Sequence, residues 1–169
     1  MILNAGGRGS RSEECFCGEG FEIHVYERRK AKAMLKDLIS DYYYGGNYNC
    51  AETLIRAAND YYDLGLHDRD MIAFGGFGAG IQTGNTCGAV LAAVSVLSMK
   101  YIEKKAHESA DIKPVTTAFI RKMNEKYGSV LCKDIKPQSF DRELRCKYTL
   151  ENVCDILEQT ISQYDKGKA

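Results

Sequence analysis

Several features that mark common functional classes are missing from this chain. Its 169 residues include 23 basic and 23 acidic side chains, so no excess of positive charge favours a nucleic acid or an anionic membrane as partner. No stretch reaches the roughly 20 apolar residues that a membrane span needs. The polar, glycine-rich residues 1–20 lack the apolar region of a secretory signal. We therefore expect a cytoplasmic protein with no nucleic-acid partner and no membrane insertion.

Motifs for several kinds of catalysis and cofactor binding are also missing. No Ser/His/Asp or paired-carboxylate constellation stands out, and CxxC, CxxCH and Walker-type GK[ST] motifs are absent. These absences argue against a thioredoxin-type site, a zinc ribbon, c-type haem and a P-loop. Any site must be assembled by the fold from residues that are distant in sequence. The histidines are scattered and are expected at the surface: His24, His67 and His107.

Alternating strand patterns are nearly absent, and apolar residues recur at helical spacing instead. The spacing predicts three helices over about 28–44, 50–64 and 87–106. A fourth is expected to begin at about 114 and to end within 126–138, where Pro137 prevents continuation. A last helix is expected from about Thr149. Residues 71–85 fit either a short helix or a strand and turn, and 21–27 is the one period-2 run.

This pattern predicts an all-α, single-domain helical bundle of about five helices with a glycine-rich loop. Residues 1–27 are expected to form a partly disordered or extended N-terminal extension. Residues 28–169 are expected to form the helical domain that carries the cysteine motifs.

A glycine-rich segment precedes the third predicted helix. Gly78, Gly80 and Gly84 approximate the spacing of a dinucleotide-binding loop, but no strand–helix–strand context surrounds them. A tight crossing of chain segments is the stronger interpretation, because glycine permits close backbone approach. The glycines of the segment are Gly75, Gly76, Gly78, Gly80, Gly84 and Gly88.

Two cysteines are predicted in the first turns of helices. Asn85 or Thr86 would cap the helix that holds Cys87, and Asn49 would cap the helix that begins with Cys50. Unpaired N–H groups and the helix dipole stabilise a thiolate at such a position and lower the pKa of the thiol. Gly84 and Gly88 would leave room beside the Cys87 sulfur for a substrate or a second sulfur.

Seven cysteines are many for a chain of this size. In a reducing cytoplasm they would be core filler, metal or cluster ligands, or redox-active thiols. Cys132 lies near the end of the fourth predicted helix, and Cys146 lies just before the last one, where Thr149 is the expected cap. Cys154 lies on an apolar stripe and is expected to pack in the core. The role of the CxC formed by Cys15 and Cys17 stays open.

The cysteine segments resemble the C_GCAxxG_C_C family of redox-active proteins. The resemblance runs from about residue 34 to 161 and rests on NCAE at Cys50, CGAV at Cys87, YGSVLC ending at Cys132 and RCKYTLENV beginning just before Cys146. Alanine replaces the final glycine of the CGAxxG pattern at position 92, and the extra cysteine at 154 leaves the fourth family cysteine open between 146 and 154. The resemblance implies a redox role without a known substrate.

Three hypotheses follow. The leading one is a thiol redox protein in which Cys87 is the activated thiolate and Cys50 its resolving partner, with Cys132 and Cys146 as a second pair or relay. The alternative is an iron–sulfur or zinc module ligated by the same four cysteines. The third is a structural or interaction protein whose cysteines only pack. The redox partner is unidentified, and a homodimer is one option for the assembly.

Overall fold

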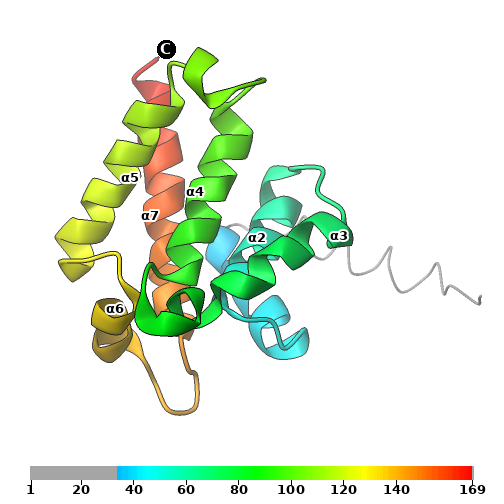
Figure 1. The fold of residues 1–169 in the computed structure, drawn as a ribbon, viewed down its shortest axis with the longest axis vertical. Helices are drawn as coiled ribbons and strands as arrows, with labels where there is room; N and C mark the ends of the chain where they lie inside the picture. Colours follow the sequence, from blue (N-terminus) through cyan, green and yellow to red (C-terminus); the bar gives the residue numbers. More distant parts are fainter. Residues whose placement is uncertain (1–33, 169) are drawn as a thin grey trace, which may run out of the picture.

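The computed structural model describes residues 34–168, and in this range the chain is all-α, as the sequence predicts (Figure 1). The described part contains no β-strand, only two isolated β-bridges, Thr86–Leu131 and Asp141–Arg145. Several sequence predictions lie outside the described residues: the 1–27 extension and its boundary, the period-2 run at 21–27, Cys15, Cys17 and His24.

The central helix is α4 (Gly88–Tyr101), which packs against α2 (Cys50–Tyr62), α5 (Ile112–Tyr127) and α7 (Lys147–Lys166) (Figure 1). No charged residue precedes Lys100 in α4, and a helix that is apolar on all sides becomes buried between its neighbours. The helix ends at Tyr101 rather than near residue 106, because Ile102 is extended. The short 3₁₀ helix η5 (Ala106–Glu108) follows separately.

The start of α2 is fixed by the cap that the sequence predicts. The side-chain oxygen of Asn49 accepts hydrogen bonds from the N–H groups of Ala51 (3.0 Å) and Glu52 (3.2 Å). The Glu52 carboxylate in turn accepts a hydrogen bond from the N–H of Asn49 (3.2 Å). This reciprocal capping box makes Cys50 the first residue of α2.

The segment before α2 is helical but irregular, where the sequence predicts one regular helix. It contains the 3₁₀ helix η1 (Leu35–Leu38) and the π-helix η2 (Asp41–Gly45), and it ends at the predicted glycine pair. The wider π turn coincides with adjacent tyrosines, of which Tyr42 and Tyr43 are both buried. The predicted apolar stripe is buried in the core, but its helix is not a continuous α-helix.

The fourth predicted helix is two helices in the structure. α5 has Pro114 in its first turn, as expected, and ends at Tyr127 because Gly128 adopts a left-handed conformation with φ of 71°. A separate helix, α6 (Cys132–Ser139), follows and contains Pro137. The prediction that Pro137 stops the fourth helix is therefore wrong.

The last helix, α7, begins two residues earlier than predicted. Cys146 is its N-cap, and Thr149 lies inside the helix. The Thr149 hydroxyl is buried and hydrogen-bonds the Ser139 hydroxyl at 2.6 Å, so it does not cap α7.

The glycine-rich region begins with short helices and contains no strand. These are α3 (Asp68–Met71) and the 3₁₀ helix η3 (Ile72–Phe77), and the segment η4 (Gly80–Gly84) that follows is not a regular helix. Ala79, Gly80, Ile81 and Gln82 have φ values of 53°, 65°, 55° and 58°, so four consecutive residues are left-handed. Such a conformation costs about 1–2 kcal/mol for each non-glycine residue. The fold therefore holds a strained turn next to the start of α4.

Candidate functional site

Four of the cysteines line one cavity of about 380 Å³, although they are far apart in sequence. Each stands at the beginning of a helix: Cys50 and Cys132 are the first residues of α2 and α6, and Cys87 and Cys146 are the N-caps of α4 and α7. The starts of α4, α6 and α7 lie at the same end of the bundle, at the bottom of Figure 1. Free N–H groups and dipole ends at helix starts favour negative charge, and burial of a thiol opposes it, so the balance differs from one cysteine to the next.

A single backbone pairing holds Cys87 beside Cys132. Thr86 and Leu131 form an antiparallel bridge, and each is followed directly by one of the two cysteines. The N–H of Cys87 donates to the carbonyl of Val130 at 2.9 Å, and the N–H of Cys132 donates to the carbonyl of Asn85 at 2.7 Å.

Tyr43 and Arg145 position Cys146. The N–H of Cys146 donates to the Tyr43 hydroxyl at 3.1 Å. The Arg145 guanidinium lies over the Tyr43 ring, 4.3 Å from its centre, and donates to the Tyr43 carbonyl at 3.2 Å. Arg145 itself has a left-handed φ of 54°. Because of these contacts, the residue before α7 and the segment before α2 form one wall of the cavity.

Among the four cavity cysteines, Cys50 is the one whose pKa is lowered. The side chains of Cys50 and Cys87 are hydrogen-bonded, and this bond is the largest cause of a pKa of about 7 at Cys50. Burial acts in the opposite direction. Backbone N–H groups of Ala79, Ala89 and Ala51 also donate to the Cys50 sulfur and lower its pKa. These donors come from the left-handed turn, the start of α4 and the start of α2.

The pKa of Cys87 is raised rather than lowered. Its hydrogen bond to Cys50 is the largest cause of a raised pKa, and burial and the Cys50 charge raise it further. Its side chain is only 4% exposed, whereas Cys50 is half-buried. Cys87 is therefore the donor of this hydrogen bond and the Cys50 sulfur its acceptor, which favours the thiolate at Cys50. This distribution differs from the expectation of an activated thiolate at Cys87.

Cys132, Cys146 and Cys154 have pKa values raised above that of an ordinary cysteine, so their thiols are protonated at neutral pH. Burial is the main cause of the raised pKa of Cys132 and of Cys146, and the charge of Cys50 raises both further. Burial also raises the pKa of Tyr43 to about 12. Cys154 lies in the core with no exposed surface, as predicted, and burial raises its pKa.

Gly88 is packed directly against the sulfur of Cys50. A Cβ atom at Gly88 would lie 2.9 Å from Cys50 Sγ and 2.6 Å from the carbonyl oxygen of Phe77. Both distances are shorter than van der Waals contact, so no other residue fits here without movement. The space beside a sulfur that the sequence predicts for Gly88 exists, and the sulfur it accommodates is that of Cys50.

Two further glycines also lie too close to neighbouring atoms to accommodate a Cβ atom. A Cβ at Gly78 would lie 2.9 Å from Nδ2 of Asn49, and a Cβ at Gly80 would lie 2.6 Å from Cβ of Cys132. Gly84 is farther from the cysteines, because a Cβ there would lie 3.4 Å from Cβ of Lys133. The glycines thus clear space around Cys50, its cap and Cys132.

The predicted caps of α4 are wrong. Cys87 is itself the N-cap, so it precedes the first turn instead of lying in it. The Asn85 side chain accepts a hydrogen bond from the N–H of Thr86 (2.8 Å), and Thr86 pairs with Leu131. Asn85 and Thr86 therefore connect the chain before Cys87 to the chain before Cys132, and neither side chain caps α4.

The structure adds residues to the site that the sequence did not indicate. Tyr43, Tyr48, Lys136, Phe140 and Arg145 line the cavity with the four cysteines. The one sequence signal that could have placed Lys136 in the site is its position one helical turn after Cys132. That spacing brings the two side chains to one helix face only if a helix begins at Cys132, as α6 does.

No group of three or more His, Cys, Asp or Glu side chains within residues 34–168 is arranged to hold a metal ion. None of the helices described is both long and apolar enough to cross a membrane. His67 and His107 are exposed, as predicted.

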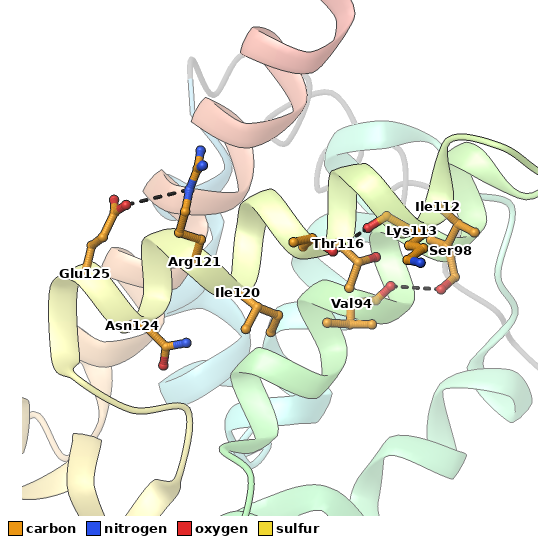
Figure 2. A pocket seen from close by; sticks show the side chains of 10 residues that line it. Val94, Ser98, Ile112, Lys113, Thr116, Ile120, Arg121, Asn124 and Glu125 are labelled. Carbon is orange, nitrogen blue, oxygen red and sulfur yellow. Dashed lines mark hydrogen bonds and ion pairs between the residues drawn. The ribbon is translucent and has the colours of Figure 1, made fainter.

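A larger hollow of about 990 Å³ lies between α4 and α5, away from the cysteines (Figure 2). Its charged residues include the exposed ion pair of Arg121 with Glu125, at 3.7 Å. No cysteine, histidine or tyrosine lines it. The cavity with the four cysteines is therefore the candidate functional site.

A family model described as "Putative redox-active protein (C_GCAxxG_C_C)" matches residues 48–160. The chain belongs to this family. The match covers all four cavity cysteines and confirms the resemblance inferred from the sequence. Cys146 lies in the cavity with Cys50, Cys87 and Cys132, whereas Cys154 lies in the core. Ala92, where the motif has glycine, is fully buried in α4. No curated protein and no solved structure matches the chain.

Proposed function

We propose that this member of the redox-active family is a thiol–disulfide oxidoreductase in which Cys50 is the nucleophile and Cys87 the resolving thiol. The observation that carries the proposal is that Cys50 and Cys87 line one cavity and interact there, with opposite pKa shifts. The pair is the one expected from the sequence, with the roles exchanged. A thiolate with a pKa near the ambient pH combines a high ionised fraction with good nucleophilicity.

The arrangement supports a balanced two-electron exchange. The Cys50 thiolate attacks one sulfur of a substrate disulfide, the substrate S–S bond breaks, and one substrate thiolate leaves. Cys87 then loses its proton and attacks Cys50 Sγ, which forms the Cys50–Cys87 disulfide and releases the second substrate thiolate. The proton from Cys87 and one proton from solvent convert both leaving groups to thiols. The substrate disulfide is reduced and the protein dithiol is oxidised.

The same site can run in reverse, when a reduced dithiol attacks the Cys50–Cys87 disulfide. The five cysteines of residues 34–168 are free thiols, which corresponds to the reduced form. We place the protein in the cytoplasm in this proposal, because thiol buffers there regenerate the reduced form. Cys132 and Cys146 line the same cavity and act as a second pair: their dithiol reduces the Cys50–Cys87 disulfide and is itself converted to a Cys132–Cys146 disulfide.

The pH dependence of thiol alkylation tests the assignment. The pKa of Cys50 is lowered to about 7 and that of Cys87 is raised, so Cys50 should gain reactivity as pH rises through about 7, while Cys87 stays protected through pH 9. Reduced protein would be treated with iodoacetamide between pH 5 and 10, and modification at each cysteine measured by peptide mass spectrometry.

Cys132 serves as the internal comparison, because its raised pKa predicts that its reactivity rises only at alkaline pH. A Cys50 profile that rises together with that of Cys132 would remove the basis for the nucleophile assignment. Faster alkylation of Cys87 than of Cys50 at pH 7 would restore the roles expected from the sequence.

A further inference from the structure

The cysteine cavity has an uneven charge distribution. Lys136 and Arg145 line it, and none of its lining residues is an aspartate or a glutamate. Lys136 lies one turn after Cys132 on α6, and its charge lowers the pKa of both Cys132 and Cys146, although burial outweighs this effect. Two cations against one thiolate at Cys50 leave an excess of positive charge in the cavity.

Neither cation is neutralised within the described part of the chain. Residues 34–168 contain no ion pair of Lys136 or Arg145 with a carboxylate. Lys136 instead lies 4.7 Å from the centre of the Phe140 ring, and Arg145 lies over Tyr43. An aromatic face holds a cation in place without cancelling its charge, so both groups stay available to an anion.

The cavity also limits the size of a ligand. Its volume of about 380 Å³ fits a small molecule, and the apolar surfaces of Tyr43, Tyr48 and Phe140 accompany the cations. Cys87, which must meet the intermediate, is 4% exposed. A buried resolving thiol favours a compact substrate over the surface of a second protein.

We propose that the substrate is a low-molecular-weight disulfide that carries carboxylate groups, with Lys136 and Arg145 binding the carboxylates while Cys50 attacks the disulfide. This inference rests on the proposed function. The covalent steps are those given above: the substrate is reduced to two thiols, each with its carboxylate, and the Cys50–Cys87 dithiol supplies both electrons. The cations contact the substrate and take no part in bond making.

Three small disulfides of different charge test the proposal: 3,3′-dithiodipropionate (two carboxylates), 2-hydroxyethyl disulfide (neutral) and cystamine (two ammonium groups). The reduced full-length protein would be mixed with each, quenched with acid, and the oxidation of Cys50 followed by mass spectrometry. Each rate would be divided by the rate of the same disulfide with 2-mercaptoethanol, which removes differences in intrinsic reactivity. We expect the normalised rate for the dicarboxylate to exceed the neutral rate by about tenfold, and cystamine to be slowest.

Lys136→Gln supplies the matched variant, because the Lys136 side chain is exposed on α6. It should reduce the ratio of the dicarboxylate rate to the neutral rate by about threefold or more. Lys133→Gln removes the same charge from the same helix outside the cavity and should leave the preference intact. Arg145→Lys, which keeps the charge, should retain more of the preference than Arg145→Gln.

The outcomes separate this inference from the proposed function. If Cys50 reacts with all three disulfides at equal normalised rates, or fastest with cystamine, the anionic substrate is wrong and the thiol chemistry stands. If Lys133→Gln and Lys136→Gln have equal effects, the preference comes from the overall field and not from this cavity. If Cys50 reacts with none of the three, the proposed function itself fails.

Discussion

Cys50→Ala is expected to abolish the fast-reacting thiol and to slow the reaction with small disulfides by at least about 100-fold at pH 7. The reason is that Cys50 alone combines partial exposure with a pKa lowered to about 7. Cys132 and Cys146, the other accessible thiols of the cavity, have raised pKa values and are mostly protonated at this pH. Stopped-flow measurement of thiolate release from a chromogenic disulfide would give the rate.

Cys154→Ala is the matched control, because it removes a thiol of the same size from the core. It should leave the rate within about twofold of the unmodified protein while lowering stability by roughly 1 kcal/mol through the cavity it creates. Equal loss of rate in both variants would mean that the fold, not the Cys50 thiolate, governs reactivity. An unchanged rate in Cys50→Ala would show that another cysteine is the nucleophile.

Gly88→Ala has the second large expected effect. The new Cβ would lie 2.6 Å from the Phe77 carbonyl oxygen and 2.9 Å from Cys50 Sγ. The carbonyl belongs to backbone and cannot rotate away, so we expect α4 to shift and the fold to lose about 1–3 kcal/mol of stability. The same shift separates the Cys50 sulfur from its donors at the start of α4, which should raise the pKa of Cys50 and reduce its alkylation at pH 7.

Gly76→Ala is the control for this substitution, because a Cβ at Gly76 meets no atom within 4 Å and its φ is not left-handed. Thermal unfolding and iodoacetamide reactivity at pH 7 would be measured for both variants. If Gly88→Ala unfolds at the same temperature as Gly76→Ala and keeps the reactivity of Cys50, the close packing of α4 against Cys50 is not required by the site.

The helix starts that carry Cys50 and Cys87 could be predicted, or nearly so, from residues adjacent to them in the sequence. Asn49 and Glu52 form a capping box within four residues, so the start of α2 at Cys50 could be predicted from sequence alone. The helix of Cys87 was also predicted, but its start differed by one residue. Thr86 is held by Leu131, 45 positions away, and a pairing of that kind leaves no local signal.

The roles of the two thiols could not be predicted because their pKa values depend on distant donors. The N–H groups that lower the pKa of Cys50 come from Ala79 and Ala89 as well as from its own helix. Ala79 donates from a run of left-handed residues that includes Ile81, a β-branched residue for which this conformation is rare. A helix-start argument treats Cys50 and Cys87 alike, and only the tertiary arrangement distinguishes them.

Disulfide mapping after limited oxidation tests the central claim most directly. The reduced protein would be oxidised with one equivalent of diamide, its remaining thiols blocked with iodoacetamide, and the chain cleaved with trypsin. Cleavage after Lys and Arg separates the cysteines of residues 34–168 into different peptides: 37–56, 70–100, 127–133, 146–147 and 148–166. Peptides 37–56 and 70–100 should be recovered joined by a Cys50–Cys87 disulfide. Recovery of these two peptides as separate alkylated species, with oxidation confined to other cysteines, would contradict the account.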